Sequence, residues 1–331
     1  MDYISEQPYI FFPNIQIRRG EDDAVNDGSL PRFLPLREAT MDYHRGDFEP
    51  AKRCFRDTED HSPAKLTTAL LALAAAISSG DYALYDDIHT WLQGRLALSP
   101  GPENELRLRY PEYMAAASMG APEMLPGWLK SGDLSAAPAS LRPGFLLFHM
   151  MCLRAERKYE QLLGTAKTAL AVYSNPQHFI PSDILYCLLG ALAAYNLGER
   201  ETALGLIGRA ARDAMPYGFI VPFAEYVNGC GGLIEEYLLR EYPEQARQII
   251  KLAPRLWKNW IDFHNKYTQD NITTILTPKE YHVAELLKNG ATYAQAAESL
   301  RLSIGRVRCI VSDIYGKLCI NSKSELSRFI L

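Results

Sequence analysis

Two arginines, Arg306 and Arg308, lie in a stretch whose apolar residues recur with the period of a helix. Guanidinium groups on the outer face of such a helix can bind phosphate oxygens or the O6/N7 edge of guanine. For two arginines alone, an ordinary solvated helix face is the more common explanation. The stretch reads SLRLSIGRVRCIVSDIYGKL, residues 299 to 318, and its recurring apolar residues are Ile304, Val307, Val311, Ile314 and Leu318, of which the last four are expected to point inward.

The residues before this stretch predict two short helices that would support it. TPKE opens the first, with Thr277 as N-cap and Glu280 placed to complete a capping box. Asn289-Gly290 ends that helix, and the second is expected over about 293 to 299. A tight turn through Leu302 follows.

Ser303 is placed to cap the long helix, and Ser322 with Glu325 predicts a further capping box for a short last helix. A short helix, a tight turn and a longer helix with a polar outer face let the second helix lie in a DNA major groove. The outward positions of the long helix are Gly305, Arg306, Arg308, Cys309, Ser312 and Gly316.

From Leu276 to Leu326 the chain resembles the LuxR-type helix-turn-helix without an insertion. That pattern is roughly LTPREREVL, a gap, then G.SNKEIA..L.IS..TVK.H...I..KL.V.SR.EL, and the residues here are LTPKEYHVAELLKNGATYAQAAESLRLSIGRVRCIVSDIYGKLCINSKSEL. The resemblance implies that Val307 and Arg308 meet the major groove and that Lys317 and Lys323 lie near the DNA backbone. The candidate DNA-binding residues are Thr292, Ser303, Gly305, Arg306, Val307, Arg308, Cys309, Ser312, Lys317 and Lys323.

Several positions depart from that pattern. Ala294 and Gln295 replace a Lys-Glu pair, which removes one phosphate contact that the resemblance implies. Ile310 stands where a histidine is common, and Arg306 stands where a threonine is.

Two further departures bear on charge and on helix termination. Asp313 would be repelled by DNA phosphate unless a cation pairs with it, and Lys317, four residues on, is expected to do so. Cys319 replaces a glycine at a helix end, where the left-handed conformation favours glycine.

The body of the chain predicts an all-α fold, with helical periodicity from residue 31 to 260 and no sheet. Gly46, Gly80 and Gly198 each end one helix within two residues of the next, and further turns are expected near Gly120 and over 157 to 159. The first two glycines lie 34 residues apart in the sequence, and this spacing resembles irregular tetratricopeptide repeats.

Stacked hairpins form a superhelix with a concave face that suits a peptide, protein or small effector. The alternative is a plain helical bundle with all its aromatic residues in the core. Helical periodicity is the same in both cases, so it does not identify the residues of an effector site. The segment MPYGFIVPFAEY, residues 215 to 226, is similar to the end of the helical sensor of MalT-like regulators. Those regulators also carry an ATPase domain, but no GxxxxGK[ST] motif is present here.

Four segments follow from these patterns: an N-terminal extension over 1–30, a TPR-like sensor or interaction domain over 31–261, a linker over 262–275, and a LuxR-type helix-turn-helix domain over 276–331. Three aromatic residues just before the linker allow two interpretations. They form either a seam between the sensor domain and the DNA-binding domain or the end-cap of the last hairpin, and they are Trp257, Trp260 and Phe263.

Charge and motifs narrow the classes of function. From residue 276 onward the chain carries eight Lys and Arg against five Asp and Glu, a net charge of +3. The rest of the chain therefore carries a net charge of −7, because the total is −4. A basic module on an acidic body favours a polyanion partner, although +3 is also compatible with an ordinary surface. No HExxH, GxSxG or zinc-ligand spacing occurs, so we expect no enzyme, cofactor or metal.

The chain shows no signal-peptide pattern and no apolar run long enough to span a bilayer, so we expect a soluble cytoplasmic protein without a membrane partner. Two functions remain. The first is a transcription regulator that senses an unknown effector and binds double-stranded DNA as a homodimer. The second is an interaction protein whose C-terminal module serves dimerisation or docking.

Overall fold

The structure is a computed structural model that describes residues 17–18, 34–62, 64–98, 101–139, 141–174, 177–268, 276–318 and 320–330. Helices make up most of these residues, and the chain is all-α as its periodicity predicts. It divides into two compact units, Met1–Phe223 and Ala224–Leu331.

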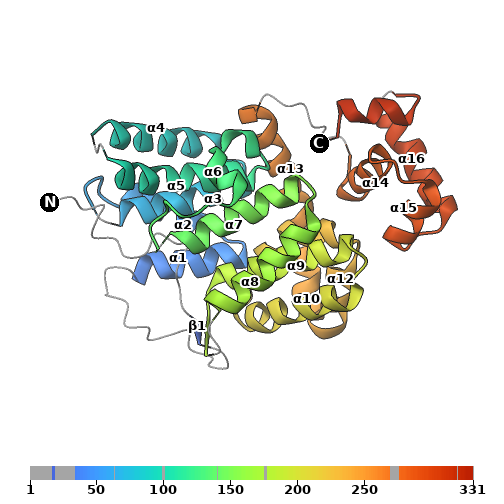
Figure 1. The fold of residues 1–331 in the computed structure, drawn as a ribbon, viewed down its shortest axis with the longest axis horizontal. Helices are drawn as coiled ribbons and strands as arrows, with labels where there is room; N and C mark the ends of the chain where they lie inside the picture. Colours follow the sequence, from blue (N-terminus) through green and yellow to red (C-terminus); the bar gives the residue numbers. More distant parts are fainter. Residues whose placement is uncertain are drawn as a thin grey trace. The chain divides into compact units, whose positions relative to one another are not determined.

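The first unit is built from helices that follow one another as short-turned hairpins (Figure 1). The main helices are α1 Leu34–Arg45, α2 Glu49–Asp57, α3 Lys65–Ser79, α4 Tyr82–Leu98, α5 Pro102–Ser118, α6 Gly127–Ser131, α7 Arg142–Ala155, α8 Tyr159–Tyr173, α9 Pro181–Asn196 and α10 Arg200–Ala214. The short 3-10 turns η2 Pro122–Met124 and η3 Met215–Tyr217 and helix α11 Val221–Tyr226 complete the list.

Consecutive hairpins pack on each other in sequence order. Helix α3 contacts α1, α2, α4 and α5, and helix α9 contacts α7, α8 and α10. The strongest packing in this unit therefore joins helices that are close in sequence, as expected for stacked hairpins.

The predicted hairpin turns are confirmed. Gly46, Gly80, Gly120 and Gly198 all have positive φ, and the amide of Gly80 returns to carbonyls of α3. At the remaining predicted turn, over 157 to 159, Arg157 takes the left-handed conformation with φ of 58°. A residue other than glycine therefore ends α7.

The segment that follows α10 packs back onto the first helix. Arg45 Nε donates to the carbonyl of Tyr217 at 3.0 Å, and the Ile220 amide donates to the carbonyl of His44 at 2.9 Å. The ring of Phe219 lies 5.0 Å from that of His44, and both side chains are buried. The first and last parts of the hairpin array therefore contact each other.

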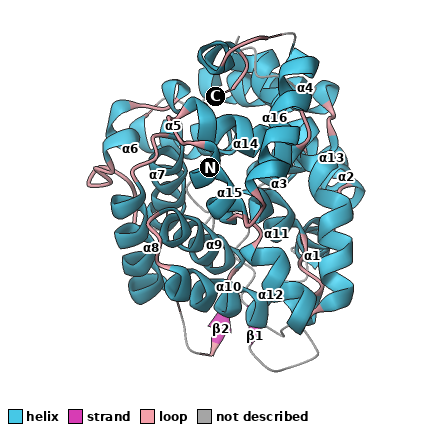
Figure 2. Cartoon of the chain, turned by 90° about the vertical axis from the view of Figure 1, so that its right-hand side faces the viewer, coloured by secondary structure: helices cyan, strands magenta, loops and turns pink. Residues whose placement is uncertain are grey.

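The sequence predicted no sheet, but the structure contains one short pair of strands. Strands β1 Ile17–Arg18 and β2 His178–Phe179 pair antiparallel, with Ile17 opposite Phe179 (Figure 2). A pairing of two residues is too short to leave an alternating pattern in the sequence. Apart from residues 17 and 18, the predicted extension over 1–30 lies outside the described residues.

The second unit contains elements that the sequence had assigned to the sensor domain, namely the 3-10 helix η4 Val227–Cys230, α12 Leu233–Glu241 and most of α13 Pro243–Thr268. Its other helices are α14 Pro278–Lys288, α15 Tyr293–Leu300 and α16 Ile304–Leu318, with the 3-10 helix η5 Lys323–Arg328. We call α14, α15, α16 and η5 the C-terminal module. The compact-unit boundary lies at 223/224 rather than after 261, because α13 shares a core with this module.

The predicted linker over 262–275 is wrong in its first half, since α13 continues to Thr268. An ion pair from Lys258 to Asp262 and a hydrogen bond from Thr268 Oγ1 to the His264 carbonyl support these last turns. Residues 269–275 lie outside the described residues. None of the helices in the described ranges combines the length and apolar character needed to cross a bilayer.

Candidate nucleic-acid interface

Helix α14 begins with the predicted capping box. The Glu280 amide donates to Thr277 Oγ1 at 3.3 Å, and the Thr277 amide donates to Glu280 Oε2 at 2.8 Å. Asn289 and Gly290 end this helix, as their types predict. Each box satisfies amides that the first turn of a helix leaves without a partner.

Helix α15 begins with a second capping box that the sequence reasoning missed. The Gln295 amide donates to Thr292 Oγ1 at 3.2 Å, and the Thr292 amide donates to Gln295 Oε1 at 2.8 Å. The signal was present as Thr-x-x-Gln, but Gln295 was considered only as the replacement of a family residue. Thr292 is exposed, yet its hydroxyl is engaged in this cap.

The turn from α15 to α16 is tight and capped. Arg301 ends α15 in the left-handed conformation, and its amide donates to the Glu298 carbonyl at 3.2 Å. Ser303 Oγ then accepts from the Arg306 amide at 3.1 Å, as a cap residue should. The start of α16 is thus set by side-chain bonds within the module.

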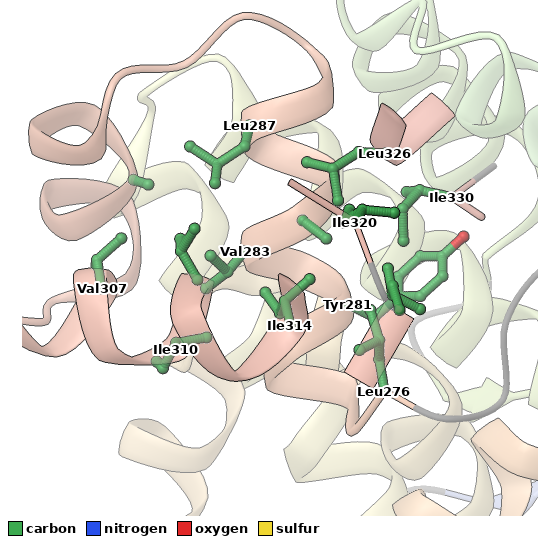
Figure 3. Packing of buried hydrophobic residues seen from close by; sticks show 14 of the residues in the cluster. Leu276, Tyr281, Val283, Leu287, Val307, Ile310, Ile314, Ile320, Leu326 and Ile330 are labelled. Carbon is green, nitrogen blue, oxygen red and sulfur yellow. The ribbon is translucent and has the colours of Figure 1, made fainter. Parts of the chain in front are cut away.

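The inner face of α16 packs into a core shared by α14, α15 and η5 (Figure 3). Val307 is 0% exposed, so its inward position in the helical pattern is confirmed, and its side chain belongs to the module core and not to the exposed face of α16. Ile304, the first residue of α16, is 45% exposed. The buried positions of α16 are Val307, Ile310, Val311, Ile314 and Leu318.

The outer face of α16 combines small residues with two arginines. Neither the Arg306 nor the Arg308 guanidinium forms an ion pair or hydrogen bond with a residue that the structure describes. A Cβ added at Gly305 would meet no atom closer than 3.9 Å, so this glycine leaves space rather than relieving strain. The predicted outward residues Gly305, Arg306, Arg308, Cys309, Ser312 and Gly316 are all exposed.

Lys317 does not pair with Asp313 as predicted. Its Nζ lies 2.7 Å from Glu280 Oε2 and 2.9 Å from Oε1, on a different helix. Burial opposes ionisation of Glu280, but the hydrogen bonds from Lys317 and Thr277 outweigh it and hold the pKa of this carboxyl below its usual value. Asp313 is exposed and forms no ion pair with a described residue.

Lys323, also predicted to lie near the DNA backbone, is directed into the module. Its Nζ donates to the Ala291 carbonyl at 2.9 Å, which ties η5 to the turn after α14. The predicted capping box at Ser322 is incomplete, since Glu325 accepts from Ser322 Oγ and the Asn321 amide, while Ser322 caps no amide. The last helix is accordingly a 3-10 helix, and Cys319 lies outside the described residues.

The tryptophans before the linker contact the module. The rings of Trp257 and Tyr281 meet edge to face with centroids 4.9 Å apart, and Trp260 stacks on Trp257 at 5.3 Å. Ile261 is fully buried in the module core. Trp257 and Trp260 therefore form a seam with the module, whereas Phe263 stacks on Tyr267 of its own helix.

A contact across α12 and the α15–α16 turn was also missed. The guanidinium of Arg301 pairs with the carboxylate of Glu236. On the same helix, burial raises the pKa of Glu235, and the nearby charge of Lys279 opposes that rise. Glu235 and Glu236 precede the module by more than forty residues and gave no sequence signal for these contacts, because only the tertiary fold brings them together.

The outer face of α16 offers groups that could bind a partner. Two guanidinium groups flank a strip of small side chains on an exposed helix face, which suits an anionic or hydrogen-bonding surface. Within the described ranges, no group of three His, Cys, Asp or Glu side chains could hold a metal ion. No family model, curated protein or solved structure matches this chain.

Proposed function

We propose that the chain is a DNA-binding transcriptional regulator with a LuxR-type helix-turn-helix, and that a TPR-like hairpin array senses an effector or partner. The observation that carries this proposal is the outer face of α16, where the Arg306 and Arg308 guanidinium groups are exposed and form no ion pair with any residue in the described ranges. Other arginines of the chain pair locally with acids of their own helix, as Arg107 and Arg109 do with Glu103 and Glu105 on α5.

In this proposal α16 lies in the major groove of double-stranded DNA. Arg308 binds guanine O6/N7 or a phosphate, and Arg306 binds the phosphate backbone. Gly305, Cys309 and Ser312 are small enough to let the helix approach base edges closely. A homodimer places two such helices on two half-sites of the DNA. The proposed location of the protein is the cytoplasm.

The runner-up is an interaction protein whose C-terminal module docks on a protein. Asp313 favours it, because this exposed carboxylate forms no ion pair within the part of the chain that the structure describes, and phosphate repels it. Lys317 and Lys323 favour it as well, since both ammonium groups already have partners inside the module.

Fluorescence anisotropy with mixed-sequence duplex DNA across a salt series separates the two. For the regulator we expect affinity to fall steeply with salt, because phosphate contacts release condensed counterions. Arg308→Ala should weaken binding about tenfold and reduce the logarithmic salt slope by about one.

Arg53→Ala is the matched control, since Arg53 is an exposed arginine on α2 of the other unit. It removes the same charge from the chain and should leave DNA affinity unchanged. Absence of wild-type binding at low salt, or equal losses in both variants, would contradict the proposal and favour the interaction protein.

A further inference from the structure

Arg301 occupies a strained position in the turn between α15 and α16. Its φ is 53° and its ψ 42°, a left-handed conformation that side chains other than those of Gly, Asn and Asp rarely adopt. Glycine would terminate α15 at lower cost, so the arginine calls for an explanation in what its side chain does.

The side chain reaches out of the module. Its guanidinium pairs with Glu236 of α12, 65 residues earlier in the chain, and both side chains are about half exposed, at 50% and 43%. The neighbouring Glu235 instead has a buried carboxylate oxygen, so Glu236 is the α12 acid that faces this turn. The pair is open to solvent and therefore to a competing anion.

The partner of Arg301 differs in origin from the partners of two other cations of the module. Lys317 is held by Glu280 and Lys323 by the Ala291 carbonyl, and both partners belong to the module itself. Arg301 is held by an acid from outside it.

The location suits a phosphate contact. Arg301 precedes the cap residue Ser303 by two positions, at the N-terminal end of α16, which is the end that enters the groove in helix-turn-helix proteins. A guanidinium binds carboxylate and phosphate oxygens in the same bidentate geometry, so the two anions compete for one site.

We propose that Arg301 is a further phosphate-binding residue and that Glu236 occupies it in the free protein, as an intramolecular competitor that DNA phosphate displaces. This inference rests on the proposed DNA-binding function. It adds a third arginine to the interface and makes the position of α12 a determinant of DNA affinity.

A double-mutant cycle in the full-length chain tests it, with anisotropy on the same duplex DNA and salt series. Glu236→Gln should tighten binding by up to about fivefold, the range expected from an exposed ion pair. Arg301→Gly should weaken binding and reduce the logarithmic salt slope by about one. In the Arg301→Gly background, Glu236→Gln should have no effect, because its competitor role is gone.

Two controls separate this competition from general effects. Glu241→Gln removes the same charge from the same helix, at an acid paired with Arg240, and should not tighten binding. Arg301→Gly places glycine where the left-handed conformation favours it, so the melting temperature should be unchanged or higher. Arg301→Asn, which also tolerates that conformation, serves as the second variant.

Equal tightening by Glu236→Gln in both backgrounds, or by Glu241→Gln, would overturn the competition. An unchanged salt slope in both Arg301 variants would overturn the phosphate contact. If wild type binds DNA but either of these contradicting results is obtained, the proposed function stands and only this inference fails. If neither wild type nor any variant binds DNA at low salt, the proposed function fails, and this inference fails with it.

Discussion

Helices α9 and α16 have nearly the same length, 16 and 15 residues, but distribute their side chains in opposite ways. In α9 every residue from Pro181 to Ala194 is buried, including Ser182 and Asp183. In α16 one face is buried and the other presents polar and small residues to solvent. A helix covered on all sides contributes stability alone, whereas a half-covered helix keeps a surface for a partner.

The same contrast holds for charges. Asp183 is buried and its oxygens accept bonds from the Ile180 amide at 3.1 Å and from Ser174 Oγ at 2.9 Å. Arg306 and Arg308 lie in solvent without such bonds. Substitutions in the hairpin array should therefore cost stability, and those on the outer face of α16 should cost binding.

The largest effect is expected where two elements of the array approach most closely. A Cβ added at Gly144 of α7 would overlap Tyr110 Oη and lie 2.7 Å from its Cζ, and Tyr110 is 1% exposed. Gly144→Ala should destabilise the first unit by ~3 kcal/mol, because the Tyr110 ring is buried against Phe145 and Phe148 and cannot shift without disturbing them. Urea unfolding would measure it.

Gly205→Ala on α10 is the matched control, since a Cβ there meets nothing within 4 Å. It should stabilise the chain by about 0.5–1 kcal/mol, through the helix preference of alanine. The same loss in both variants would mean that close packing at Gly144 is not the cause.

Acid should affect the two units over different pH ranges. Burial lowers the pKa of His44 in the first unit to about 3 from 6.5, so the folded state keeps it neutral while the unfolded chain takes up a proton. This contribution to stability is complete above pH 6.5 and is lost as the pH falls towards 3. Between pH 6.5 and 4.5 the loss should be ~2 kcal/mol.

Glu280 in the second unit has a lowered pKa, so its contribution is present above its ordinary value of 4.5 and is lost only below it. Urea unfolding of wild type and His44→Leu at pH 6.5 and 4.5 checks the difference. The variant should lose less stability over this interval, and an identical loss in both proteins would exclude His44 as the cause.

A smaller effect should separate the two faces of α16. Val307→Ala should destabilise the C-terminal module by ~2 kcal/mol, because it removes two methyl groups from a fully buried site. Arg308→Ala should change stability by less than about 0.5 kcal/mol. Native-state hydrogen exchange of peptides from α16 measures both, and a stable Val307→Ala module would argue that Val307 is not a core residue.

Local pattern predicted much of this fold. The capping box at Thr277 and the cap at Ser303 were predicted because a cap depends on residues within one helical turn. The turns at Gly46, Gly80 and Gly198 followed from residue type for the same reason. The two-residue pairing of β1 with β2 left no such local pattern and was missed.

By itself, the sequence determined the helical hairpins, the order of short helices in the C-terminal module and the outward position of Arg306 and Arg308. Helical periodicity and capping act over three or four residues, so they are readable along the chain. The partners of Lys317 and Arg301, the seam at Trp257 and the extent of the second unit were decided only by the tertiary structure. Each of these depends on which helices meet across tens of residues, and a long charged side chain pairs with whichever acid the fold brings within reach.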